Sequence, residues 1–385
     1  MSDSPLLSYL RRRCSLFGSS LDWLARELQG LGITSSHHTP VFRELDGVLA
    51  EARNQLRQLK LIVDDGHPWF VRRGLPIIHD IECTIGLLAC QYLPALSRED
   101  TRDRFLGGVL LRACERVGLD WVNDVVVRLD APCACWPVPT SIPLFFGPQN
   151  QSETILDLPG FYHEFGHIVF EKFGQIRTRL ATVVEDYFSK LESSAGPQDP
   201  ASRTAREGDI RAAVEYWGPS RLNEVFSDVF GSFAAGPAHY ASLVDLAMRG
   251  SHDAYYVDQG DEHPPLFARV MTSRLALYQN YQAVESIAKI ESAWRDHLGE
   301  RGPSSSYSLR CSEALLRALV NEGRRCIFDF MSSAKEYRRP LGELKPGNTY
   351  SAEMELEDLV NAALMVLLVS PEKYSQWELR QLGPH

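Results

Sequence analysis

Long apolar runs are missing from this sequence. A membrane-spanning helix needs roughly 18–20 apolar residues, and the longest candidate, Ala362–Val369, is far shorter. The arginines at positions 11–13 follow the first apolar residues of the chain, whereas a secretory signal has its basic residues first. We therefore expect a chain without a membrane span, located in the cytoplasm.

Basic residues and paired cysteines are also scarce. The 40 Lys and Arg residues are outnumbered by 50 Asp and Glu, which gives a formal net charge of -10. This charge disfavours nucleic acid as the main partner. The eight cysteines include no C-x-x-C pair, so free thiols in a reducing compartment are expected. Cys133 and Cys135 are expected to lie in a plain loop bounded by proline, and the alternative is a switch that reaches a metal.

The most informative feature that is present is the motif H-E-x-x-H at positions 163–167. Residues four apart share one face of a helix, so the imidazoles of His163 and His167 can reach a single ion. Imidazole is a common zinc ligand, and Glu164 is then placed to take a proton from water at the metal. The alternative is a pair of hydrogen-bonded histidines in an apolar core. The motif thus predicts a zinc site with Glu164 as general base.

A catalytic zinc site usually has three protein ligands and one open position. A third histidine within the same helix is excluded, because Phe170 and Phe173 occupy the required Gly and His positions. The best candidate is Glu224, since Asp228 lies four residues further along a predicted helix over 220–235. One of these carboxylates can bind the metal while the other holds a ligand imidazole by its second nitrogen.

Three other acidic residues are rivals for the third-ligand role. They are Glu185, Asp186 and Glu215, and none has an acidic partner four residues on. We therefore predict zinc ligation by His163, His167 and Glu224, with Asp228 as the residue that orients a ligand histidine.

In these two motifs the chain resembles a known group of enzymes. H-E-x-x-H followed by E-x-x-x-D is the signature of gluzincin metallopeptidases, and Asn223–Asp228 is similar to the corresponding helix of thermolysin relatives. A third segment, His263–Arg269, has the form H-P-P-x-x-x-R. It is similar to the family that includes CaaX prenyl endopeptidases and bacterial heat-shock membrane proteases. The resemblance covers about residues 124–269 and implies that His263 assists the reacting carbonyl while Arg269 belongs to the charge network.

The chain departs from that family in lacking a membrane span, so a soluble relative is expected and the family's membrane-protein substrates are not carried over. The fold class that we predict is mainly α with a small β-sheet (α+β). Residues 121–300 would form the zincin-like core, with a helical N-terminal region at 1–120 and a helical C-terminal region at 301–385.

Apolar periodicity and β-branched runs predict the individual elements. Short strands are expected over 124–129, 141–146 and 153–156. Helices are expected over 41–63, 79–93, 98–117, 161–173, 220–235, 268–297, 308–332 and 351–369.

The predicted function is a zinc-dependent endopeptidase that hydrolyses peptide or protein substrates. His239 or Tyr240, at the end of the Glu224 helix, is a candidate hydrogen-bond donor to an oxyanion or a substrate. Two alternatives remain open. One is a catalytically silent, zinc-stabilised module that binds a regulatory partner through its helical flanks, and the other is a hydrolase of small amides or esters.

Overall fold

The computed structural model describes twelve segments of the chain. They are residues 5–34, 39–66, 72–97, 101–128, 134–136, 142–146, 155–194, 200–249, 253–278, 285–300, 302–344 and 355–382. These residues are mostly helical with a small parallel sheet, which confirms the mainly α prediction. They form two compact units. The first is Met1–Leu111, Trp121–Arg128 and Trp136–Phe146, and the second is Arg112–Asp120, Leu129–Cys135 and Gly147–His385.

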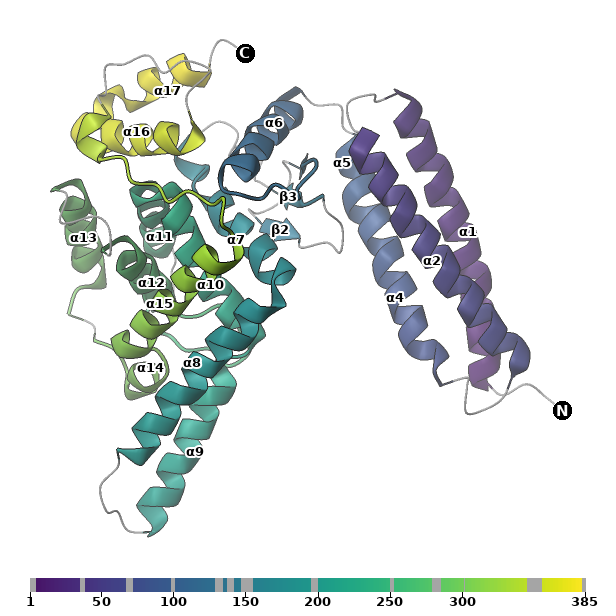
Figure 1. Ribbon diagram of the computed structural model, residues 1–385, viewed down its shortest axis with the longest axis horizontal. Coiled ribbons are helices and arrows are strands. Elements are labelled where there is room, and N and C mark those ends of the chain that lie inside the picture. The colour runs from purple at the N-terminus through teal and green to yellow at the C-terminus, as the bar shows by residue number, and fades with distance from the viewer. Residues whose placement is uncertain are drawn as a thin grey trace. The chain divides into compact units, whose positions relative to one another are not determined.

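The first unit begins with three packed helices, α1 (Pro5–Thr34), α2 (Thr39–Asp65) and α4 (Gly74–Leu87) (Figure 1). A π-helix (Leu88–Tyr92) and α5 (Leu93–Ser97) continue α4. Apolar residues at helical spacing are buried between these helices, among them Leu45, Leu49, Leu56 and Leu59 of α2. The predicted helix over 41–63 is therefore confirmed, and its period of about 3.6 residues is what buries one face.

Three short strands follow α6 (Thr101–Arg116), in the sheet order β1-β3-β2. β1 (Val126–Arg128) pairs in parallel with β3 (Leu144–Phe146), with Val126 opposite Leu144. Both lie inside predicted strands. The strand expected over 153–156 is wrong where the structure describes it, because Ile155–Asp157 form a 3-10 turn that leads into the next helix.

The Cys133–Cys135 prediction is only partly described. β2 (Ala134–Trp136) is a strand, so the expected loop is wrong at Cys135. Cys133 and the side chain of Cys135 lie outside the described part of the chain.

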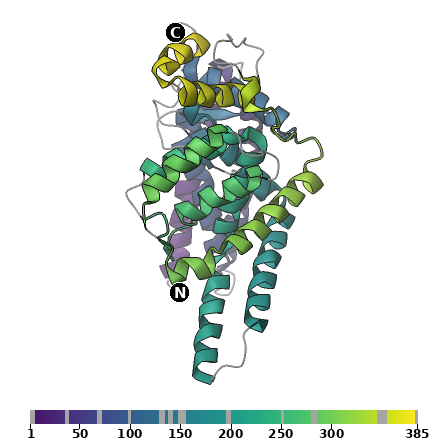
Figure 2. The same ribbon diagram turned by 90° about the vertical axis from the view of Figure 1, so that its left-hand side faces the viewer.

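The second unit is a helical assembly. Its α-helices are α7 (Gly160–Lys172), α8 (Gly174–Ser193), α9 (Pro200–Tyr216), α10 (Pro219–Ala235), α11 (Pro237–Arg249), α12 (Leu266–Tyr278), α13 (Glu285–Leu298), α14 (Ser305–Arg310), α15 (Glu313–Phe330), α16 (Leu356–Val369) and α17 (Tyr374–Leu382). Single 3-10 turns lie at Leu341–Glu343 and Pro371–Lys373. Figures 1 and 2 both show α8 and α9 side by side as a long helical hairpin.

Helix α10 is the central element of this unit. Pro219 at its first turn suits a helix start, and Gly236 ends it with a φ of 62° that disfavours other residues. Every residue from Glu224 to Ala235 is buried, because α7, α8, α11, α12, α15 and α16 all pack against the helix. A helix that is covered all round places its polar side chains inside the protein, where each needs a partner.

Two predicted helices are divided in the structure. The helix expected over 268–297 is α12 and α13, and the one expected over 308–332 is α14 and α15. The second break has a clear local cause, since the Ser312 side chain accepts a hydrogen bond from the Leu315 amide and so caps a new helix. Within the described residues, no helix combines the length and apolar character that crossing a membrane requires.

Candidate metal centre

The centre is built on the contact between α7 and α10. Gly166 lies between the two motif histidines, and a Cβ added there would stand 2.5 Å from the Cα of Ser227. Only glycine permits this approach. The backbones of the two helices therefore meet at the point where α7 carries His163 and His167 and α10 carries Glu224.

The two imidazoles face the Glu224 carboxylate. His163 Nε2 lies 3.4 Å from Oε2, and His167 Nε2 lies 3.4 Å from Oε1. Donor atoms of His163, Glu164 and His167 also lie within 4.8 Å of one another. Ligands about 2.0–2.1 Å from a tetrahedral zinc are about 3.3–3.4 Å apart. The distance from each histidine to the Glu224 carboxylate is therefore in the range expected between two ligands of one zinc ion.

The second ring nitrogen of each histidine is held by α10. His167 Nδ1 lies 2.9 Å from Asn223 Oδ1 and 3.1 Å from Ser227 Oγ. His163 Nδ1 lies 2.9 Å from Asp228 Oδ1. When each Nδ1–H donates to these oxygens, Nε2 keeps its lone pair on the side of Glu224, which is the tautomer that a metal ligand requires.

Arg269 joins the two carboxylates of α10. Its Nε and Nη2 donate to the two oxygens of Asp228, each at 2.9 Å, and Nη1 lies 3.3 Å from Glu224 Oε2. Asp228 is fully buried at 0% exposure, so this bidentate pair supplies the charge partner that a buried carboxylate needs. Oε2 of Glu224 is buried too and accepts no hydrogen bond from the described residues. A carboxylate oxygen in that state fits a metal ligand.

These contacts set the protonation of the metal-free centre. Burial and the Arg269 charge lower the pKa of His163, but the interactions with Asp228 and Glu224 outweigh them and raise it to about 9. Burial and the neighbouring His163 lower the pKa of His167. Burial raises the pKa of Glu224 and Asp228, but Arg269 and His163 lower both below the usual range. The acids are therefore ionised, and a metal must displace a proton from His163.

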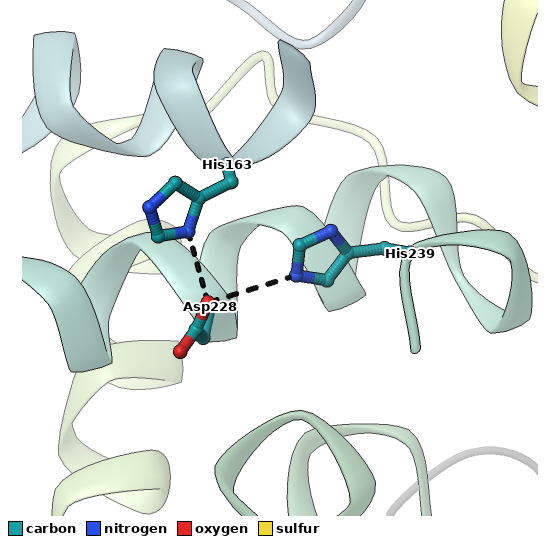
Figure 3. Close-up of side chains that lie close together, drawn as sticks. All are labelled: His163, Asp228 and His239. Atoms are coloured by element: carbon teal, nitrogen blue, oxygen red, sulfur yellow. Dashed lines mark ion pairs between the residues drawn. The ribbon is translucent and has the colours of Figure 1, made fainter. Parts of the chain in front are cut away.

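His239 extends the cluster at Asp228, and Figure 3 shows the ion pairs of His163 and His239 meeting at the same carboxylate. Its ring stacks on His163 with centroids 6.2 Å apart, and its Nε2 lies 3.9 Å from Asp228 Oδ1. Burial lowers the pKa of His239 to about 4. The ring lies against α10 where Gly231 leaves room for it, because a Cβ there would be 2.7 Å from the imidazole.

The group His163, Asp228 and His239 also has residue types that bind metals. Arg269 already donates to both oxygens of Asp228, so a cation placed there would meet a guanidinium. Arg269 also lies 3.3 Å from Glu224 Oε2 and 3.3 Å from His163 Nε2, so its charge is close to both positions. The Glu224 side of His163 is the position that the H-E-x-x-H motif predicts. His239 is buried beside this network, and its Nδ1 lies 3.4 Å from the Pro159 carbonyl oxygen.

His263 lies at the outer side of the centre. Its side chain is 55% exposed, and its Nε2 is 3.6 Å from Glu224 Oε1. It precedes α12, whose first turns carry Arg269, so one short segment brings both residues to the centre. Tyr240 is different, since it packs in an apolar cluster with Val270 and Trp294.

The structure separates the rival ligands from the centre and adds residues that sequence reasoning gave no role. Glu185, Asp186 and Glu215 are exposed on α8 and α9. Asn223 and Ser227 both contact His167, and they are four residues apart on the same helix as Glu224 and Asp228. This shared i, i+4 spacing is the feature of the sequence that could have indicated a role for Asn223 and Ser227.

No family model, curated protein or solved structure matches the chain. The case for a function therefore depends on the geometry of the residues themselves.

Proposed function

We propose that the chain is a zinc-dependent endopeptidase, a soluble relative of the gluzincin metallopeptidases. The observation that supports this most directly is the placement of two imidazole Nε2 atoms at the Glu224 carboxylate. The Nε2 of His163 lies 3.4 Å from Oε2, and the Nε2 of His167 lies 3.4 Å from Oε1. The Nδ1 atoms of the same imidazoles contact side-chain oxygens of α10.

In the proposed mechanism His163, His167 and Glu224 hold the ion. Zinc supplies Lewis acidity, which polarises a carbonyl and makes a water more acidic. Glu164 takes a proton from the attacking water and passes it to the leaving amine nitrogen. The Nε2 of His263, on the exposed side of Glu224, stands where it can donate to the oxygen on which negative charge develops.

Asp228 and Arg269 position these groups without touching substrate. Asp228 fixes the His163 ring, and Arg269 neutralises the two buried carboxylates of α10. Their arrangement keeps the donor set in place when no ion is bound.

The test is zinc content together with cleavage of denatured casein, measured on wild type and on Glu164→Gln. Glutamine keeps the size of the side chain but cannot act as the base, so we expect one zinc per chain in both proteins. Turnover should fall about 10²–10⁴-fold in the variant, the range for loss of a general base.

Other outcomes have distinct meanings. Equal cleavage by both proteins would contradict the role of Glu164. One zinc per chain with no cleavage by either would favour the catalytically silent binding module. Glu224→Ala gives an independent check, because it should lose zinc. Full occupancy in that variant would return the third-ligand role to another acid.

A further inference from the structure

The segment before α12 is built from three aspartate turns. In each, a carboxylate accepts the backbone N–H two residues ahead. Asp253 accepts from Tyr255 at 2.9 Å, Asp258 from Gly260 at 2.8 Å and Asp261 from His263 at 2.9 Å. Such turns fix the local backbone without a helix or a strand.

One of these turns does more than shape the backbone. The same Oδ1 of Asp261 that accepts the His263 amide also lies 2.9 Å from Nδ1 of the His263 ring. When Nδ1–H donates to this oxygen, Nε2 becomes the ring nitrogen that faces Glu224, 3.6 Å away. Backbone and ring are therefore held by a single atom, which limits how the imidazole can turn.

Arg221 fastens the segment to the start of α10. Its Nη2 donates to the carbonyl oxygens of Asp258, Gln259 and Asp261, at 3.1 and 3.0 Å for the first two. Its Nη1 donates to the Tyr216 carbonyl at 2.7 Å, and the guanidinium lies 4.1 Å from the centre of the Tyr216 ring. The arginine is three residues before Glu224, so the loop is tied to the helix that carries the third ligand.

We propose that Asp261 is a positioning residue for His263, and that Arg221 holds the backbone conformation in which Asp261 can reach the ring. The carboxylate fixes which imidazole nitrogen faces the centre and stabilises the positive charge on the ring while Nε2–H donates to the developing oxyanion. This inference rests on the proposed function for its catalytic part, whereas the orientation of the ring does not depend on turnover.

The test compares Asp261→Asn, Asp261→Ala and the matched control Asp258→Ala. Asparagine keeps an oxygen that accepts both N–H groups but removes the charge, and alanine removes both. Asp258→Ala breaks a turn of the same kind in the same segment without touching the ring. For cleavage of internally quenched casein, we expect kcat to fall about 10²-fold for Asp261→Ala and about 10-fold for Asp261→Asn. KM should stay within about twofold, and Asp258→Ala should match wild type.

A second readout is independent of activity. Histidine-selective ¹⁵N NMR of the zinc-loaded proteins reports whether Nδ1 of His263 is protonated, with His263→Gln used to assign the signal. At a pH where the ring is neutral, we expect a protonated Nδ1 in wild type and in Asp261→Asn, and a mixture of tautomers in Asp261→Ala. An unprotonated Nδ1 in wild type, or an unchanged signal in Asp261→Ala, would overturn the proposal. The expected NMR result in a protein that cleaves nothing would uphold the positioning of His263 and count against the peptidase function.

Discussion

Two aspartates hold histidines on either side of Glu224, and they do so in opposite surroundings. Asp228 lies 2.9 Å from Nδ1 of His163, and Asp261 lies 2.9 Å from Nδ1 of His263. The first pair is in the contact between α7 and α10, where Asp228 is fully buried. The second is in the segment before α12, where both side chains are about half exposed, at 51% and 55%.

The difference shows two ways to fix an imidazole. In the helix pair, orientation comes from packing and from a buried ion pair, so it is tied to the stability of the whole unit. In the loop, orientation comes from a local turn and from one arginine bound to carbonyl oxygens. Changes in the first region should therefore affect folding and metal binding, while changes in the second should affect catalysis with little loss of stability.

The largest effect on stability is expected for Arg269→Met. This change removes the guanidinium from between the buried carboxylates of Asp228 and Glu224 and leaves them with protonated His163 as the nearby cation, which costs about 3–5 kcal/mol. Urea unfolding of the metal-free protein measures the loss. Arg203→Met is the control, because its pair with Glu207 is exposed and should be worth less than about 1 kcal/mol. Equal losses in the two variants would contradict the role given to the buried pair.

Zinc affinity should depend steeply on pH through the helix pair. The pKa of His163 in the metal-free centre is raised to about 9, so the proton is present at neutral pH and must leave when zinc binds. The apparent affinity should thus rise about tenfold per pH unit up to about pH 9 and level off above it. Competition with a chromophoric chelator from pH 6.5 to 9.5 gives the slope. A flat profile over that range would show that His163 is not a protonated ligand.

A smaller loss of stability is expected for Gly166→Ala. The new Cβ would stand 2.5 Å from Ser227 Cα, so α7 and α10 must move apart, at a cost of about 1–3 kcal/mol. Gly208→Ala is the matched control, because no atom lies within 4 Å of a Cβ at that position of α9. It should be neutral or more stable by up to about 1 kcal/mol. Thermal unfolding of both variants decides whether the helix contact is as close as described.

The smallest change in global stability is expected for Arg221→Met, which releases the loop from the start of α10. The bonds to the carbonyl oxygens of Asp258, Gln259 and Asp261 are exposed, so these oxygens can bind water instead, and only the bond to Tyr216 is partly buried. The free energy of unfolding should therefore change by less than about 1 kcal/mol. Hydrogen exchange of the segment 253–265 should nevertheless become faster, roughly tenfold. Arg249→Met, which removes an exposed pair with Asp245, should leave that exchange unaltered. Unchanged exchange in Arg221→Met would mean that the arginine does not hold the loop.

Much of the helical fold could be predicted because amphipathic periodicity is local. The helices that carry the centre were expected at 161–173 and 220–235 and lie at Gly160–Lys172 and Pro219–Ala235. The end of α12 at Tyr278 was missed, since residues 279–284 contain neither glycine nor proline to indicate a break. The strand expected over 153–156 is wrong at Ile155 and Leu156, because these residues and Asp157 form a 3-10 turn two residues before α7.

The candidate metal centre could likewise be predicted only in part from the sequence. The i, i+4 spacing of His163 and His167, and of Glu224 and Asp228, could be seen in the sequence, whereas their mutual distances could not. The contact between Asp261 and His263 spans two residues, yet an aspartate two positions before a histidine is too common to stand out. Arg221 binds carbonyls 37 to 40 residues away, and only the folded chain brings them together.

The close approach of Gly166 and Ser227 has a consequence for the choice of ion. The histidines lie on one helix and Glu224 on the other, so the radius available to a cation is set by two backbones in contact. Calcium bonds are about 2.3–2.6 Å long and zinc bonds about 2.0–2.1 Å, so calcium would require the donor atoms of the two helices to lie further apart. For the metal site that we propose, we therefore expect the contact between α7 and α10 to favour zinc over calcium.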